Sequence, residues 1–318
     1  MIISKTPFRI SLFGGSTDYK SFYSKYESLL VGFAIDKYCY ITSRYTPAIL
    51  PYHTKISYSK IEVVNNNQDI EHDGVRGVLT YLDELSKGVE INHFSDLPSQ
   101  TGIGSSSSFV VGLLKNWKRD CSRYELADAA IKIERDILKE AGGIQDQIWA
   151  AYGGMNSISI KTNGKFQVKP LPVSDAFKDS FLKRSFLIYT GRTRKSYKIA
   201  SSHNNPNSTD VKKRILDTAY IGYDAFQDED INQIAGLLHK SWFYKKSISP
   251  LVSSVEVDGM YSALIDSGMI GGKLLGSGGS GFIFGIAKNK SAKDRIVKQF
   301  GENVVNISIS ENGSEIIK

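Results

Sequence analysis

The sequence predicts an α+β protein made of two domains. Its 318 residues are enough for two separate hydrophobic cores. The first 45 residues hold two long strand-like runs, whereas residues 210 to about 267 show helical spacing, so both kinds of element are expected. A polar stretch with Gly and Pro, at about residues 161–172, separates two regions that each contain strands and helices. We therefore expect one domain over residues 1–165 and a second over residues 166–318.

The first region opens with two runs in which apolar, β-branched and aromatic residues alternate with polar ones. These runs are IISKTPFRISLF (2–13) and SLLVGFAIDKYCYITSRY (28–45). The alternation is typical of half-buried strands. A helix over about residues 75–85 and a strand over about residues 90–94 should follow.

More helices follow the stretch DLPSQTGIGSSSSFVVGLL (96–114). Apolar residues at spacings of three and four predict a helix that begins within the serines; they are Phe109, Val110, Leu113, Leu114 and Trp117. A second helix is expected over residues 123–140, with Gly142 and Gly143 as its C-terminal stop. A short helix in DQIWAAYGG (146–154) then leads into the strand MNSISI (155–160).

The second region repeats this mixture of strands and helices. FLIYTG (186–191) and GFIFGIA (281–287) are typical of buried strands, and several helices are expected between residues 210 and 267. No internal repeat is visible along the sequence.

Composition narrows the class of partner. The formal charge of +7 and a pI near 9.1 suit an anionic ligand, although a solvated basic surface explains the charge equally simply. Lys and Arg are scattered, so we expect no nucleic-acid partner. The two cysteines, Cys39 and Cys121, are too few for a disulfide framework, and no apolar run reaches the ~20 residues of a membrane span. We expect a cytoplasmic protein with no membrane partner.

Two glycine-rich stretches call for an explanation. GxGxxG occurs at Gly276, Gly278 and Gly281, but a strand-like run follows it, which favours a tight loop over a dinucleotide site. The stretch 96–114 is either a Ser-rich linker or a phosphate loop. The amphipathic helix that follows it favours the loop, because glycines can aim N–H groups at an anion and a helix N-terminus attracts one. Ser105–Ser108 add hydroxyls for phosphate or for Mg²⁺.

Three stretches together resemble the GHMP kinases. TPFRISLFGGSTDY (6–19), DLPSQTGIGSSSSF (96–109) and KLLGSGGSGFIF (273–284) are similar to that family's three motifs and occur in the same order. The resemblance implies an N-terminal ATP-binding α/β domain, a C-terminal ferredoxin-like α+β domain, and an active site in the cleft between them. A finer resemblance, to the branch that phosphorylates heptose 7-phosphate, lies in EHDGVRGVL (71–79), GGIQDQIWAAYGGMN (142–156) and YTGRTRKS (189–196).

The resemblance implies roles in phosphoryl transfer for particular residues. The loop that wraps the ATP phosphates is Gly102, Ile103, Gly104, Ser105, Ser106 and Ser107. Ser106 and Glu134 would hold Mg²⁺, Asp146 would take the proton of the attacking hydroxyl, and Arg9 would stabilise negative charge. Simpler interpretations remain for three of them: an exposed helix carboxylate for Glu134, a helix N-cap for Asp146 and an exposed strand residue for Arg9.

The acceptor site is expected at two other places. Asp18, in a turn with Gly14, Gly15 and Thr17, would accept sugar hydroxyls, with an Asx-turn as the alternative. A phosphate already on the acceptor would need cations, for which Arg192, Arg194 and Lys195 are the candidates, Lys245 and Lys246 the reserves, and a solvated basic loop the alternative. The third motif adds Gly278 and Gly279. His203 and His239 are expected to be surface or structural residues.

The function that this resemblance implies is ATP-dependent phosphorylation of a sugar. The expected acceptor is the anomeric hydroxyl of a heptose 7-phosphate, giving a 1,7-bisphosphate for nucleotide-activated heptose synthesis. Two alternatives stay open: a kinase for another sugar, such as fucose or galactose, and a regulator that binds sugar and ATP without turnover. ATP and Mg²⁺ are the expected cofactors, and a second copy of the chain is left open as a partner.

Overall fold

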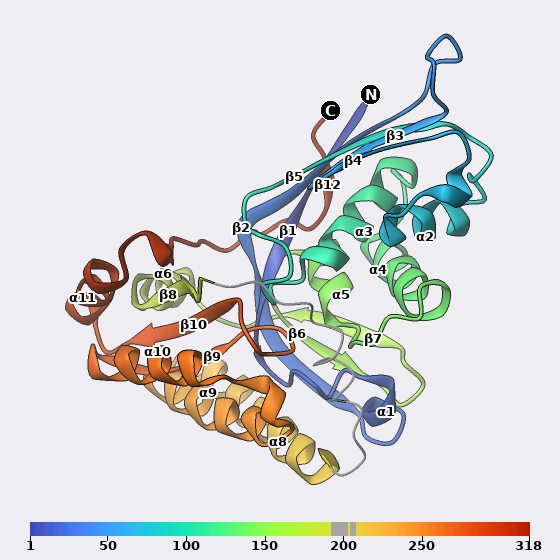
Figure 1. Cartoon of the computed structure of the whole chain (residues 1–318). Coiled ribbons are helices and arrows are strands. Elements are labelled where there is room, and N and C mark those ends of the chain that lie inside the picture. Colours follow the sequence, from blue (N-terminus) through green and yellow to red (C-terminus); the bar gives the residue numbers. More distant parts are fainter. Residues whose placement is uncertain (192–202, 204–207) are drawn as a thin grey trace.

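Two long antiparallel strands, β1 (Ile2–Phe13) and β2 (Ser28–Tyr45), form the centre of the N-terminal sheet (Figure 1). The computed structural model describes residues 1–191, 203 and 208–318. Within that range the sheet runs β12-β1-β2-β5-β3-β4, and β6 and β7 extend it from β2. The shorter strands are β3 (Thr54–Ser57), β4 (Ile61–Val64), β5 (Val89–Ser95), β6 (Met155–Ile160), β7 (Phe166–Pro170) and β12 (Glu315–Ile316). Both central strands coincide with the runs predicted from alternation.

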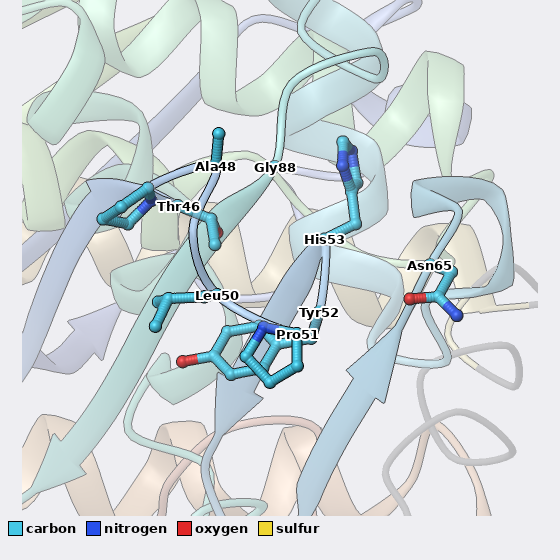
Figure 2. Close-up of a pocket in the computed structure, with 9 residues that line it drawn as sticks. Thr46, Ala48, Leu50, Pro51, Tyr52, His53, Asn65 and Gly88 are labelled. Atoms are coloured by element: carbon cyan, nitrogen blue, oxygen red, sulfur yellow. The ribbon is translucent and has the colours of Figure 1, made fainter.

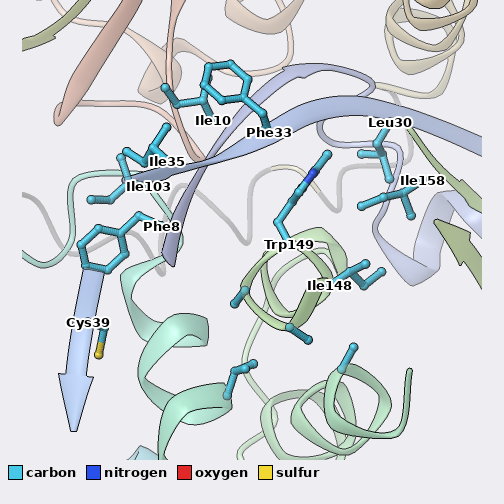
Figure 3. Close-up of a cluster of buried hydrophobic side chains, with 14 of the residues drawn as sticks. Phe8, Ile10, Leu30, Phe33, Ile35, Cys39, Ile103, Ile148, Trp149 and Ile158 are labelled. Atoms are coloured by element: carbon cyan, nitrogen blue, oxygen red, sulfur yellow. The ribbon is translucent and has the colours of Figure 1, made fainter. Parts of the chain in front are cut away.

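Helices cover one face of this sheet (Figure 1). They are α2 (Asp73–Tyr81), α3 (Ser105–Trp117), α4 (Arg123–Lys132) and α5 (Gln145–Tyr152), while α1 (Lys20–Tyr23) and the 3₁₀ turn η1 (Asn67–Asp69) lie in the loops. Figure 3 shows Ile148 and Trp149 of α5 in the buried core on this side of the strands, and Ile10 and Phe33 on the opposite side. The helix predicted to begin within the serines is α3, and its apolar residues at spacings of three and four enter this core.

The helix expected over residues 123–140 is shorter and irregular. After α4, residues Ile133–Ile137 form a π turn, η2, and the chain leaves the helix at Lys139, whose φ is 55°. Gly142 and Gly143 are therefore not the stop that the sequence suggested. The apolar spacing in the sequence did not distinguish this π turn from a regular α-helix. Its consequence is local, because it turns Glu134 into the protein interior.

The C-terminal domain is a four-stranded antiparallel sheet in the order β11-β8-β10-β9. Its strands are β8 (Ser185–Tyr189), β9 (Met269–Leu274), β10 (Phe282–Ala287) and β11 (Val304–Val305). The helices are α6 (Asp175–Arg184), α8 (Thr209–Gln227), α9 (Ile231–Lys246), α10 (Val255–Asp266) and α11 (Lys290–Phe300), with 3₁₀ turns η4 (Pro250–Val252) and η5 (Gly301–Asn303). Helices follow β8 and β10 along the chain, which is the β-α-β-β-α-β arrangement of ferredoxin-like domains. This confirms the expected α+β fold.

An apolar contact joins the two domains, and the chain crosses between them twice. Phe33 on β2 lies edge-on to Phe181 on α6 and Phe284 on β10, with ring centroids 6.0 Å apart in both pairs. After β11 the chain returns to the N-terminal sheet, where β12 pairs with β1. Residue 165, the expected end of the first domain, lies between β6 and β7, which are hydrogen bonded to each other.

No helix in the described part of the chain is long and apolar enough to cross a membrane.

Candidate active site

An ion pair joins Arg9, near the start of the N-terminal domain in the sequence, to Asp146, near its end. Arg9 lies on β1 and is only 4% exposed, and Asp146 is the second residue of α5. Arg9 Nε and Nη2 donate to Asp146 Oδ1 at 2.8 and 2.6 Å, and Nη1 donates to the carbonyl of Gly102 at 2.6 Å. Arg9 is therefore not an exposed strand residue, and Asp146 is not the N-cap, which is Ile144. Both bonds use Oδ1, which leaves Oδ2 available for another partner.

The predicted phosphate loop lies directly on this pair. Gly104 is the N-cap of α3 with φ 81°, and a Cβ built on it would lie 3.4 Å from Arg9 Cγ and 3.5 Å from Asp146 Cγ. The Arg9 amide also donates to the carbonyl of Ile103 at 3.1 Å. The first turn of a helix leaves N–H groups without intrahelical partners, so α3 presents donors beside the pair. The loop is thus a structured element and not a linker.

The serines of the loop divide between solvent and interior. Ser106 is exposed, and Ser105 Oγ accepts a bond from the Gln100 amide at 3.4 Å. Ser107 Oγ donates to Glu134 Oε2 at 3.1 Å, and Ser108 Oγ donates to the carbonyl of Pro7 at 2.9 Å. The loop serine that contacts Glu134 directly is therefore Ser107.

Glu134 is a buried carboxylate with one oxygen left over. It is 1% exposed, and its Oε2 accepts bonds from Gln147 Nε2 at 2.6 Å and from Arg135 Nη2 at 3.1 Å, besides Ser107. Oε1 has no hydrogen-bond partner within the described residues. Burial raises the pKa of Glu134 to about 7. A buried carboxylate oxygen without a partner is suited to a hard cation such as Mg²⁺. The interpretation of Glu134 as an exposed helix residue is wrong.

Asp18 is fixed by backbone amides from two segments. Its Oδ1 accepts from the amide of Ser16 at 3.1 Å, and its Oδ2 accepts from the amide of Gln145 at 3.2 Å. Burial raises the pKa of Asp18, and the nearby Asp146 adds to the effect. Gly143 is needed here, because a Cβ on it would lie 1.7 Å from Asp18 Oδ2. In the same turn, Thr17 Oγ1 donates to the carbonyl of Gly14 at 2.7 Å.

The third glycine stretch is a tight loop between β9 and β10, as its GxGxxG pattern and the strand after it predicted. It packs on the phosphate loop: a Cβ on Gly276 would lie 2.3 Å from Gly102 Cα, and one on Gly281 would lie 2.2 Å from the carbonyl of Thr101. Gly278 and Gly279 lie against η4 instead, with the Gly279 amide donating to the carbonyl of Val252 at 2.8 Å.

Sequence reasoning missed Lys273 on β9. It is 4% exposed, and its Nζ donates to the carbonyl of Leu12 at 3.0 Å. Burial lowers the pKa of Lys273 to about 7, and Arg9 adds to the effect whereas Asp18 opposes it. The available signal was a lysine inside an otherwise apolar strand, since long cations are rarely buried without a role.

The lysines and the histidine predicted outside the three motifs have separate environments. Lys245 is buried and donates to the carbonyls of Leu274 and Gly276 at 2.9 and 2.6 Å, so it supports the third loop. Lys246 pairs with Asp258 at the surface at 2.9 Å. His203 is buried, with its ring bonded to Ser16 Oγ and to the carbonyl of Ser277, both at 2.9 Å. Three predicted cations lie outside the described residues: Arg192, Arg194 and Lys195.

The histidine on α9 has a local packing role. His239 Nδ1 is hydrogen bonded to the hydroxyl of Tyr261 at 2.8 Å, and burial lowers the pKa of its imidazole. Both histidines are therefore structural within the described part of the chain.

One open pocket lies away from these residues. It has a volume of about 430 Å³ and lies beside the loop of residues 46–53, where Figure 2 shows Pro51, Tyr52, His53 and Asn65 around it. This loop follows β2 and contacts Gly88, just before β5 begins, whereas the phosphate loop follows the other end of β5. The pocket therefore adjoins none of the candidate catalytic residues.

Comparisons with known proteins agree with this arrangement. Residues 56–154 match the model of the GHMP kinases N terminal domain, and residues 223–306 match that of the GHMP kinases C terminal domain. A D-glycero-alpha-D-manno-heptose 7-phosphate kinase of Campylobacter jejuni is 30% identical over 89% of this chain and 88% of its own length. A crystal structure titled as a D-glycero-D-manno-heptose 1-phosphate kinase from Bacteroides thetaiotaomicron has a TM-score of 0.82 and 23% identity, covering 100% of this chain and 99% of its own. A putative sugar kinase from Campylobacter jejuni has a TM-score of 0.76 at 24% identity, over 99% of this chain and 97% of its own.

Proposed function

This chain belongs to the GHMP kinases, and we propose that it transfers the γ-phosphate of ATP to the anomeric hydroxyl of D-glycero-D-manno-heptose 7-phosphate. The observation that carries the proposal is the Arg9–Asp146 pair, because it lies between the phosphate loop at Gly104 and the turn that holds Asp18. A phosphate donor on one side and an alcohol on the other would meet at this pair. The product is a 1,7-bisphosphate.

Asp146 is the proposed proton acceptor. Its Oδ1 is held by two N–H groups of Arg9, so the carboxylate keeps a fixed orientation while Oδ2 can accept the proton of the attacking hydroxyl. Arg9 also places a permanent positive charge beside the transferring phosphate, where negative charge must be stabilised. These two residues therefore supply the base and one of the cations that phosphoryl transfer requires.

The phosphate loop would position the nucleotide. The start of α3 lies against the Arg9–Asp146 pair at Gly104, so its free amides are suited to the β- and γ-phosphates. Glu134 and the hydroxyls of that turn, Ser106 among them, would hold Mg²⁺, because Glu134 Oε1 is a buried carboxylate oxygen without a partner among the described residues. When bound, the ion would offset the negative charge of the phosphates.

The acceptor would bind at the turn of residues 14–18. Asp18 is buried and fixed by the Ser16 and Gln145 amides, which suits it to orient sugar hydroxyls next to Asp146. A phosphate on the sugar would be neutralised by the cations predicted at Arg192, Arg194 and Lys195. The combined presence of Arg9, Glu134 and Asp146 favours an enzyme over a binding protein without turnover.

A panel of acceptors tests the proposal. Purified protein with ATP and Mg²⁺ is given heptose 7-phosphate, free heptose, fucose or galactose, and ADP release is followed. We expect the highest kcat/KM with heptose 7-phosphate, and ³¹P NMR should show the new phosphate on the anomeric carbon. Turnover of unphosphorylated sugars alone would overturn the proposal, and turnover of none would leave a regulator as the better interpretation.

A further inference from the structure

Two adjacent glycines, Gly14 and Gly15, follow β1, and the space around them differs. Gly14 has φ 79°, and a Cβ there would lie 2.0 Å from the carbonyl oxygen of Leu29, so the backbone requires a glycine. Gly15 is outside the left-handed region, and a Cβ on it would make only ordinary contacts, the nearest at 3.5 Å. The described structure therefore has room for the methyl group of an alanine at position 15, a space that the glycine leaves unfilled.

Three polar side chains from different elements surround that space. From the position of a Cβ on Gly15, Ser11 Oγ lies at 3.5 Å, Gln145 Nε2 at 3.9 Å and Lys273 Nζ at 4.0 Å. They come from β1, α5 and β9, and each side chain belongs to a residue that is at most 8% exposed. Side chains from three separate parts of the fold thus converge on one point beside a glycine.

These groups have hydrogen-bonding capacity left over. Ser11 Oγ and Gln145 Oε1 are buried and have no partner within the described residues. Lys273 Nζ donates to the carbonyl of Leu12, which uses one of its three N–H donors. Buried polar groups are almost always paired in native proteins, so a cluster of this kind indicates a ligand that completes the bonds.

The space lies on the acceptor side of the catalytic pair. The backbone amide of Gln145 donates to Asp18 Oδ2 at 3.2 Å, and Gln145 directly precedes Asp146. Lys273 interacts electrostatically with both Arg9 and Asp18. The phosphate loop, in contrast, approaches the pair at Gly104.

We propose that the space over Gly15 is a subsite for one hydroxyl of the acceptor sugar, bound by Ser11, Gln145 and Lys273. A hydroxyl matches the three groups, since its oxygen can accept from Lys273 Nζ and from Gln145 Nε2, the amide atom that faces the space, while its proton goes to Ser11 Oγ. Gly15 keeps the subsite open, so the residue at this position selects acceptors that carry a hydroxyl there. This inference rests on the proposed function and adds residues that position the acceptor.

Two variants test the subsite. Gly15→Ala fills the space without straining the backbone, and Ser11→Ala removes a buried hydroxyl that has no partner within the described residues. The matched control is Gly236→Ala on α9, where a Cβ would meet nothing within 4 Å. For each protein, Tm is measured alone, with ADP and with heptose 7-phosphate, and KM is measured for both substrates.

We expect both variants to keep the wild-type Tm and the shift produced by ADP. The KM for the sugar should rise up to about tenfold, as for the loss of one hydrogen bond, while the KM for ATP stays within about twofold. The sugar should also no longer raise the Tm of Gly15→Ala. Gly236→Ala should match the wild type throughout.

The possible failures are distinguishable. A wild-type protein that turns over no sugar of the panel overturns the proposed function and, with it, this subsite. A wild type that is active while Gly15→Ala and Ser11→Ala keep its sugar KM overturns the subsite alone. A lower Tm for Ser11→Ala together with equal rises in both KM values would show a structural role, and that result also contradicts the inference.

Discussion

Replacement of Asp146 by Asn removes the proposed base and keeps its shape. The amide oxygen of Asn can still accept from Arg9 Nε and Nη2, which now lie 2.8 and 2.6 Å from Asp146 Oδ1, but the side chain can no longer take a proton. A positioned general base contributes roughly 10²–10⁴ in rate. We therefore expect kcat to fall by that factor, which corresponds to about 3–5 kcal/mol of activation free energy.

The Asn variant separates catalysis from folding better than an Ala variant does. In Asp146→Ala the buried Arg9 guanidinium would lose its counter-ion, and breaking a buried pair costs about 3–5 kcal/mol of stability, less here because the Asp146 side chain is 27% exposed. Asn also removes the negative charge, but its amide oxygen still accepts both bonds from the charged Arg9, so the cost is on the order of 1 kcal/mol.

The assay is steady-state ADP release, with Tm measured in the presence and absence of ADP. Normal ADP binding together with a kcat lowered at least a hundredfold supports the assignment. A kcat within about fivefold of the wild type would refute the reasoning, since catalysis by a base can contribute no more than the loss observed.

Three further predictions follow from the geometry of the site. Gly143→Ala should displace the Asp18 carboxylate, from which a Cβ would be 1.7 Å away, and should raise the sugar KM while the shift in Tm produced by ADP is unchanged; a rise in the ATP KM alone would contradict this. Gly102→Ala should abolish that ADP shift, because φ is 78° and a Cβ would lie 2.7 Å from the carbonyl oxygen of Leu275; wild-type ADP affinity would count against the loop. The free energy of unfolding should rise from pH 7 to pH 9 in the wild type relative to Lys273→Met, by up to ~1.4 kcal/mol per pH unit, as measured by urea titration. The sign follows because burial lowers the pKa of Lys273 from 10.5 to about 7, so the unfolded chain binds more protons over this range, and equal slopes for the two proteins would refute it. The charged groups that face Lys273 are Arg9, Asp18 and Lys245.

The elements around the site were predictable where hydrophobic spacing is long and regular. β1 and β2 match the predicted runs, and α3 begins within the serines, because alternation over a dozen residues and helical spacing over three turns are strong local signals. Three short strands, β3, β4 and β7, escaped prediction because so short a run fits several conformations.

The contacts within the site could not be derived from local patterns. Arg9 and Asp146 are 137 residues apart, and only the resemblance of three motifs placed both in one active site. Ser107 rather than Ser106 contacts Glu134, and this contact joins α3 to a π turn for which the amino-acid pattern carries no signal. Lys273 was missed because its role depends on burial against Leu12, which follows from the packing of two domains.

The close approach of Gly102 and Gly276 makes the phosphate loop depend on both domains. The two backbones touch where the loops of different domains meet, at a separation that no side chain could occupy at Gly276. The shape of the loop is therefore a joint property of both domains, and neither domain specifies it alone. A shift of one domain against the other would disturb this contact and so the loop that is proposed to hold the phosphates. Motion between the domains would thus be coupled to this loop through the contact between Gly102 and Gly276.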